Sequence, residues 1–198
     1  MNENSLDGFF DDDSEEDVYY EGSIDLKKDL IEKWLKDNCD IEGYYSINED
    51  DSIDVEGSIS ISTDESELPV YIRFNIVSGD FDCSYCSSLE SLEGAPKEVG
   101  GNFDCSSCNS LKNLEHAPIK VGGNFNCSNC YSLESLAGMP ETLSGSFYCV
   151  NCTSLKTLES APDEVTGNFD CSGCNSLKSL ESAPKVKGNF TCPGRLVK

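Results

Sequence analysis

The sequence predicts a solenoid, a stack of short chain turns in which every turn buries one face against its neighbours. Near-identical blocks begin at six glycines spaced 22, 22, 22, 22 and 21 residues apart: Gly79, Gly101, Gly123, Gly145, Gly167 and Gly188. A fixed period of this length is typical of repeat architectures. Each block also opens on a short alternation of apolar and polar residues and closes on proline and glycine. These observations together predict one turn per block.

The opening of each block predicts a β-strand. The block reads G-N-F-D-C-S-x-C-x-S-L-x-x-L-E-x-A-P-x-x-V-x. In one copy, Phe103 and Cys105 alternate with Asn102 and Asp104, and side chains two residues apart lie on the same face of a strand. We therefore expect the aromatic ring and the first thiol to point into the core, and the polar pair to point outward.

The rest of the block predicts a return segment without a long helix. Leu111 and Leu114 bring the chain back past the core, Pro118 prevents a long helix, and the following glycines turn the chain into the next strand. A degenerate copy begins one step earlier, at Gly57, with isoleucines in place of the first aromatic ring and the first thiol. The array is therefore predicted to span residues 57–198.

Residues 23–56 predict a cap for the open end of the array. A helix is expected from residue 23, with Ser23 or Asp25 as N-cap. Segments 44–48 and 52–56 flank a turn-like stretch and predict a β-hairpin. Solenoids need such end structures because an uncovered strand edge pairs with other chains. The apolar stripe of the helix is expected to contain Leu26, Leu30, Ile31, Trp34 and Leu35.

Residues 1–22 form a strongly acidic segment. They contain nine Asp and Glu and no Lys or Arg. Such a run repels itself and is expected to be disordered alone. It is either a solubilising tail or a segment that orders on a basic partner, and its aromatic residues favour the second reading. The candidate contacts there are Phe9, Phe10, Asp11, Asp12, Asp13, Tyr19 and Tyr20.

The overall charge narrows the class of partner. The chain has 37 acidic and 14 basic residues and a formal charge of −23, of which residues 1–78 carry −18. Nucleic acid and anionic membranes would be repelled, whereas a basic protein or a cation would be attracted. The sequence contains neither a membrane-length apolar run nor the pattern of a signal peptide, so a cytoplasmic location is expected.

The twelve cysteines are therefore expected to be free thiols or metal ligands rather than disulfides. Five C-x-x-C pairs alone would favour zinc. Here each pair belongs to a repeat, with the first cysteine on the inward strand position and the second at the bend, which favours buried structural thiols. Zinc bound between two neighbouring turns stays open as the alternative.

These residues resemble a known family. Phe103, Cys105, Cys108, Leu111 and Leu114 resemble the leucine-rich repeat L-x-L-x-x-N/C with further leucines, and residues 57–192 look like the cysteine-bearing leucine-rich-repeat proteins of large tailed bacteriophages. The resemblance implies a parallel sheet on a concave side and a bend cysteine that bonds neighbouring backbone groups. Cys108 and Leu111 are one residue further apart than in the commonest spacing.

No catalytic motif is recognisable, so the sequence predicts a binding surface rather than an active site. Outward strand positions are acidic or amide in nearly every turn, and one turn departs from this with aromatic and apolar residues. Aromatic residues among small polar groups are typical of binding hot spots. The candidate contacts in the array are Asp82, Asp104, Tyr131, Tyr148 and Val150.

The resulting hypothesis is a non-catalytic protein–protein interaction module without a cofactor, whose partner is a protein with a basic surface. Extended by the resemblance, it is a phage-encoded acidic inhibitor of a host defence or nucleic-acid-binding protein, acting by charge mimicry in the cytoplasm of the host. The alternative is a structural repeat protein of a virion or scaffold that stacks through its ends.

Overall fold

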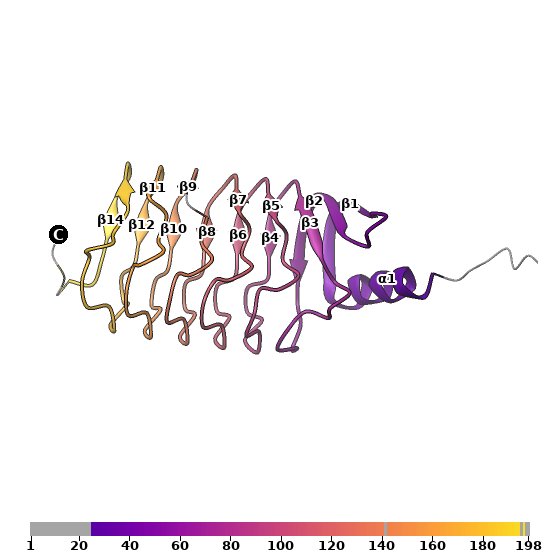
Figure 1. Ribbon diagram of the computed structural model, residues 1–198, viewed down its shortest axis with the longest axis horizontal. Helices are drawn as coiled ribbons and strands as arrows, with labels where there is room; N and C mark the ends of the chain where they lie inside the picture. The colour runs from indigo at the N-terminus through magenta and orange to yellow at the C-terminus, as the bar shows by residue number, and fades with distance from the viewer. Residues whose placement is uncertain (1–24, 141, 195, 197–198) are drawn as a thin grey trace, which may run out of the picture.

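The turns of the predicted array stack into a parallel β-solenoid. The computed structural model describes residues 25–140, 142–194 and 196. The turns follow one another along a nearly straight line, with the only described helix at the N-terminal end (Figure 1). The predicted solenoid, N-terminal helix and hairpin are all confirmed.

A helix and a hairpin form the N-terminal end. Helix α1 (Leu26–Asn38) begins at Asp25, whose side-chain Oδ1 accepts the backbone N–H of Lys28 at 3.3 Å. Strands β1 (Cys39–Ile47) and β2 (Ile53–Ile61) then pair antiparallel along their full length. Three apolar residues of α1 join the main core: Ile31, Trp34 and Leu35.

The apolar stripe expected on α1 was too wide. Leu26 is 71% exposed and Leu30 is 50% exposed, so neither enters the core. The helix lies at the end of the stack, and only the narrow face with Ile31, Trp34 and Leu35 packs against the core.

Each repeat contributes two short strands, although the sequence predicted one. The polar and apolar residues after the proline of each block form the additional strand, which precedes the glycines. It went unrecognised because its polar–apolar pair stands alone, without the longer alternation of apolar and polar residues that surrounds the first strand. The two kinds of strand form two strips that run along the stack, here called the phenylalanine strip and the valine strip.

The phenylalanine strip is parallel and in register from turn to turn. It contains β4 (Phe81–Asp82), β6 (Phe103–Asp104), β8 (Phe125–Asn126), β10 (Phe147–Tyr148), β12 (Phe169–Asp170) and β14 (Phe190–Thr191).

The valine strip is formed by β3 (Phe74–Val77), β5 (Glu98–Val99), β7 (Lys120–Val121), β9 (Thr142–Leu143), β11 (Glu164–Val165) and β13 (Lys185–Val186). Strand β2 starts both strips, because Ile53 pairs with Phe74 of β3 and Ile59 pairs with Phe81 of β4. The result is an eleven-stranded sheet and a three-stranded sheet of β9, β11 and β13.

The core consists of columns of identical residues. In-register stacking places the same block position of successive turns in contact, so each turn adds one phenylalanine, two cysteines, two leucines and a valine or leucine to the same columns. The phenylalanine rings form a continuous row from Phe74 to Phe190, with neighbouring centroids 4.9–5.7 Å apart. Ring pairs at this separation attract one another beyond their simple area burial.

The glycines between the two strips let neighbouring turns approach. The Gly101 N–H donates to the Gly79 carbonyl at 2.8 Å. A Cβ at Gly101 would lie 2.1 Å from Oδ1 of Asp80 and 2.9 Å from the Gly79 backbone. The repeated glycine is therefore a requirement of turn-to-turn contact.

Removing one ring from the middle of the phenylalanine row tests how much the row contributes to the stability of the stack. Phe125→Ala should lower the free energy of unfolding by about 3–5 kcal/mol, because the ring is fully buried between two others. Urea unfolding followed by far-UV circular dichroism measures this. Leu26→Ala at the exposed edge of α1 is the control and should change it by under about 0.5 kcal/mol. Equal effects would contradict this account of the core.

Candidate functional site

One row of outward side chains runs across the strands of the phenylalanine strip. Asp40 pairs with Ser60, Ser60 pairs with Asp82, and the register then continues through every later turn. Neighbouring strands in a sheet are about 4.8 Å apart, so these side chains are nearest neighbours. We call this set the acid row: Asp40, Ser60, Asp82, Asp104, Asn126, Tyr148, Asp170 and Thr191.

Four of the eight acid-row side chains also hold the bend that follows them. Oδ1 of Asp82 accepts the backbone N–H of Ser84 at 2.7 Å, and the same bond recurs from Ser106 to Asp104, from Ser128 to Asn126 and from Ser172 to Asp170. This leaves the second carboxylate oxygen of each aspartate to face outward. Among the described residues, only Asp104 uses it, accepting Nδ2 of Asn126 at 3.0 Å.

Tyr148 interrupts this pattern, and the structure compensates locally. A phenol at this position does not replace the carboxylate, and the backbone N–H of Val150 donates instead to Oγ of Ser128 in the preceding turn, at 3.2 Å. The aromatic residue is therefore accommodated without loss of the bend.

The other outward position of each strand is used inside the stack. Oδ1 of Asp80 accepts the backbone N–H of Asn102 at 2.6 Å, and Oδ1 of Asn102 accepts that of Asn124 at 2.8 Å. The remaining bonds of this kind measure 2.8–3.1 Å. Because these oxygens join consecutive turns, they are less available to a partner. We call this set the tie row: Ser58, Asp80, Asn102, Asn124, Ser146 and Asn168.

A hollow of about 280 Å³ lies over the two rows. Asp82 and Asp104 line it together with Tyr148, which is half-buried, and residues of the tie row. The structure thus brings together three of the five array residues that the sequence analysis singled out. Val150 is half-buried and Tyr131 is 49% exposed, and neither lines the hollow.

The remaining sequence candidates lie outside the described residues: Phe9, Phe10, Asp11, Asp12, Asp13, Tyr19 and Tyr20. The sequence analysis missed Asp40 and Ser60 as members of the row. Alternation along β1 and β2 was the available signal, but only the register between strands shows that these residues continue the row of the later turns.

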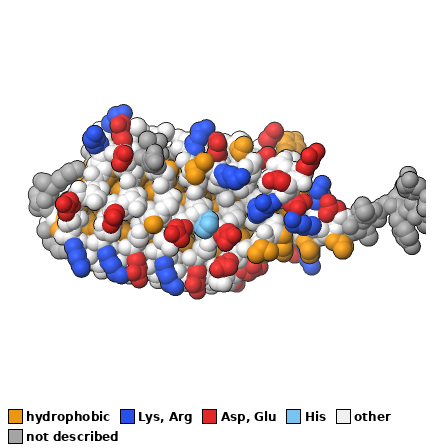
Figure 2. All heavy atoms as spheres, viewed as in Figure 1, with side chains coloured by type: hydrophobic (Ala, Val, Ile, Leu, Met, Phe, Trp, Pro, Cys, Tyr) orange, Lys and Arg blue, Asp and Glu red, His pale blue; other side chains and the backbone are white. Residues whose placement is uncertain are grey.

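Four ion pairs between neighbouring turns offset part of the charge elsewhere in the described array. Nζ of Lys120 lies 3.1 Å from Oε2 of Glu98, and Nζ of Lys112 lies 3.6 Å from Oε2 of Glu90. Lys156 and Glu134 form a further pair. Figure 2 accordingly shows charges of both signs interspersed on the face that it displays. The acid row differs, because its register contains no lysine or arginine.

The structural use of the tie row can be tested by removing one acceptor. Asn124→Leu leaves the backbone N–H of the buried Ser146 without its partner and should lower the free energy of unfolding by about 1–3 kcal/mol. Asn124→Asp keeps the accepting oxygen and should be close to wild type. Chemical denaturation of the three proteins measures the difference. Similar stabilities for Asn124→Leu and Asn124→Asp would rule out this role.

The paired cysteines form a second repeating ladder inside the core. In four of the five pairs, the second cysteine donates its thiol to the backbone carbonyl of the first cysteine one turn earlier, and Cys86 of the first pair donates to Ile61 instead. The Sγ–O distances are 3.2 Å for Cys108 to Cys83 and 3.2 Å for Cys130 to Cys105. They are 3.1 Å and 3.0 Å in the two following turns. All ten repeat thiols are free and buried, in agreement with the prediction of structural thiols.

Burial and hydrogen bonding raise the pKa of most repeat thiols whose pKa is shifted, whereas hydrogen bonds with Cys149 and Cys152 lower the pKa of Cys174. A hydrogen bond with the Cys130 thiol and then burial raise the pKa of Cys105 well above 9.0. Burial raises the pKa of Cys171 to about 12. Within residues 25–140, 142–194 and 196, no three or more His, Cys, Asp or Glu side chains are grouped so that they could hold a metal ion.

These shifts predict a loss of stability at alkaline pH. The unfolded thiols ionise near pH 8.5, whereas the folded Cys83, Cys105 and Cys149 keep their protons, so the stabilisation from these three thiols is complete below that pH and decreases above it. Above about pH 9, each such thiol should contribute about 1.4 kcal/mol per pH unit to the loss. Urea unfolding under reducing conditions between pH 7.5 and 10.5 measures the slope, which should be shallower in Cys105→Ala. An identical slope in the variant would contradict the assignment.

Comparison with known proteins adds no relative to this geometry. No protein-family model matches the sequence, and no curated protein or solved structure matches it either. The described part of the chain also contains no helix that is long and apolar enough to span a membrane.

Proposed function

We propose that this protein is a non-catalytic interaction module that binds a basic protein on its acid row. The observation that carries the proposal is the in-register placement of Asp82 and Asp104 on adjacent turns, in the same hollow as Tyr148. Carboxylates about 4.8 Å apart add their potentials, and a row without counter-charges raises the local concentration of cationic groups.

Tyr148 gives this surface an anchor as well as charge. Its side chain is half-buried in a row of small polar residues, so a partner can cover it with little loss of conformational entropy. The acid row would then determine how fast the partner arrives, while the tyrosine would determine how long it stays.

The position of the strongest nucleophiles supports a role without catalysis. The repeat thiols point into the core and are 0–3% exposed, so no substrate reaches them in the folded protein. The acid row itself repeats along the stack, as a binding surface does, and does not converge on one reacting position.

The partner class follows from charge. With a net charge of −23, the protein should avoid nucleic acid and compete with it for basic surfaces. We therefore propose an inhibitor of a nucleic-acid-binding or defence protein, in line with the resemblance to repeat proteins of tailed bacteriophages. In this proposal the acidic residues 1–22, with Phe9, Phe10, Tyr19 and Tyr20, extend the contact.

One observation favours a structural role as the second candidate. In the last turn, the core positions Val186, Phe190 and Cys192 are only partly buried. End-to-end stacking of copies would cover them, as in a scaffold. A monomeric mass in solution at micromolar concentration, measured by light scattering, would exclude this candidate.

The acid row is tested with charge-neutral variants that keep the fold. Asp82→Asn with Asp104→Asn preserves the Oδ1 acceptors of the bends and loses only the bond from Asn126 Nδ2 to Asp104 Oδ2, so the melting temperature should fall only slightly while affinity for a basic partner falls about tenfold. The partner is first captured from host lysate on the wild-type protein, then purified and titrated against each variant. Glu159→Gln with Asp163→Asn removes the same charge from exposed loops and is the control.

Binding kinetics separate the contribution of residues 1–22 from that of Tyr148. Removal of residues 1–22 deletes nine negative charges and should slow association, most strongly at low salt, whereas Tyr148→Ala should accelerate dissociation. Surface plasmon resonance at several salt concentrations measures both rates. Binding that responds neither to these changes nor to the acid-row variants would place the interface elsewhere.

A further inference from the structure

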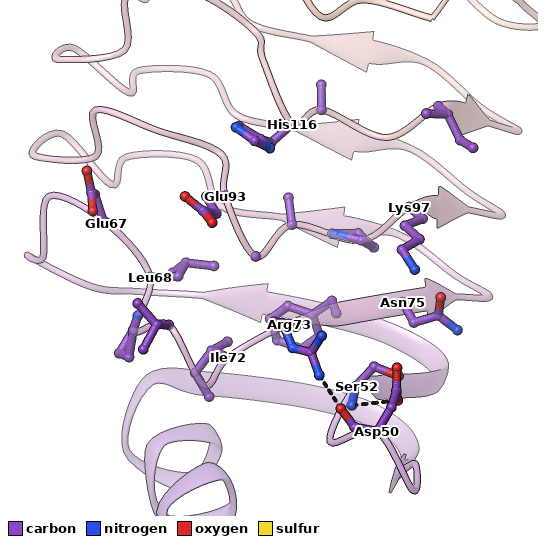
Figure 3. Close-up of a pocket in the computed structure, with 18 residues that line it drawn as sticks. Asp50, Ser52, Glu67, Leu68, Ile72, Arg73, Asn75, Glu93, Lys97 and His116 are labelled. Carbon is purple, nitrogen blue, oxygen red and sulfur yellow. Dashed lines mark hydrogen bonds between the residues drawn. The ribbon is translucent and has the colours of Figure 1, made fainter.

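A second hollow, of about 330 Å³, lies at the N-terminal end of the valine strip, and it shares no residue with the hollow of the acid row. It forms where the irregular segment between β2 and β3 meets the loops of the next two turns (Figure 3). The regular repeats pack identical loops on one another. The degenerate first turn has a different loop sequence, and the stacking is interrupted there.

The floor of this hollow is apolar and so is part of its rim. Leu68, Ile72 and Ala117 are buried at its base. On the rim, Val70 is 92% exposed and Ile119 is 74% exposed. Single exposed apolar residues are ordinary, but these two border one concave site above an apolar floor. An occupant that covered them would gain about 25 cal/mol for each Å² removed from water.

One end of the hollow is basic, which is unusual in so acidic a chain. Arg73, the only described arginine, and Lys97 from the next turn both line the hollow, and so does Asp50, which lies next to Arg73 (Figure 3). Arg73 donates a hydrogen bond to the backbone oxygen of Asp50 and keeps further N–H groups for a ligand. Nζ of Lys97 forms no ion pair with any described residue.

The other end is acidic. Figure 3 shows Glu67 and Glu93 together on the side away from Lys97, with Leu68 beneath them. Neither glutamate has an ion-pair partner in the described part of the chain. With Arg73, Lys97 and Asp50 together, one end of the hollow has one net positive charge, whereas the other end has two carboxylates, and an apolar surface lies between them.

We propose that this hollow binds an extended peptide segment of a partner protein that carries an acidic residue, an apolar residue and a basic residue in that order or its reverse. The acidic residue contacts Arg73 and Lys97, the apolar side chain lies on Leu68 and Ile72, and the basic residue contacts the two glutamates. Charge-assisted hydrogen bonds at both ends fix the direction of the segment.

The size of the site agrees with this class of ligand. A volume of 330 Å³ is at the lower end of the range of ligand pockets, about 300–1,000 Å³, and it holds one apolar side chain with flanking backbone. An extended chain advances about 3.3 Å per residue, so a few residues carry charges to both ends. The shallow rim with two apolar side chains favours a segment that passes across the hollow over an enclosed small molecule.

His116 also lines the hollow, between the two ends in Figure 3. Its φ is 67°, and glycine occupies the equivalent place in two other turns, as Gly94 and Gly138. His116→Gly therefore removes the imidazole without backbone strain. This variant measures the contribution of the ring to peptide binding separately from the contribution of the charged ends.

The experiment uses a bead-displayed library of random octapeptides, selected on the full-length protein. The proposal predicts enrichment of peptides that contain an acidic and a basic residue separated by an apolar one. Affinities of the enriched peptides are then measured by fluorescence polarisation. Arg73→Gln with Lys97→Gln, and separately Glu67→Gln with Glu93→Gln, should each weaken them about tenfold. Lys178→Gln with Glu181→Gln, in an exposed loop far along the array, is the matched control and should have no effect.

The outcomes decide the proposal in either direction. Absence of enrichment, enrichment of peptides with one sign of charge only, or affinities unchanged by both glutamine pairs would each overturn it. If Arg73→Gln lowers the melting temperature, the single variant Lys97→Gln replaces the Arg73 and Lys97 pair. Its effect on peptide affinity is then compared with that of Glu67→Gln with Glu93→Gln. Peptide binding here should also be indifferent to Asp82→Asn with Asp104→Asn, so failure of this site and failure of the acid row are distinguishable.

Discussion

Backbone hydrogen bonding between consecutive turns is the constraint on which the rest of the molecule depends. Phe103 N–H donates to the carbonyl of Asn124 at 2.9 Å, and Cys105 N–H donates to that of Asn126 at 2.9 Å. These bonds hold each block directly over the previous one, so a residue meets its own counterpart at every level. Columns of like residues follow, and each column must consist of side chains that tolerate contact with copies of themselves.

This requirement accounts for the chemistry of the blocks. Phenylalanine rings attract their neighbours in a row, and leucines fill space above leucines. The cysteines meet the same condition through hydrogen bonds, since from Cys108 to Cys174 each bend thiol donates to the carbonyl of a cysteine one turn earlier. A charged residue in such a column would meet its own charge, and the acidic residues lie accordingly on the outer face, where water screens them.

The same stacking divides the outer face into a row used for folding and a row available for binding. Oxygens of the tie row accept the amides of the following turn and are part of the structure. Asp82 and Asp170 of the acid row hold their own bends through one oxygen and leave the other outward. The register of the acid row contains no lysine or arginine, so the row is a distinct acidic surface. The irregular first turn, in contrast, creates the second hollow because it cannot reproduce the regular loop packing.

The sequence by itself determined the repeat, the inward rings and thiols, the capping helix and the hairpin, because these follow from local patterns with a fixed period. It also pointed to Asp82, Asp104 and Tyr148. Only the tertiary structure decided that Asp40 and Ser60 belong to the same row, that Asn102 and Asn124 serve the stack, and that Arg73 and Lys97 share a hollow. These depend on register and on the fit of one irregular loop against its neighbours. Both are set by contacts between residues 20 or more positions apart, which a local pattern does not encode.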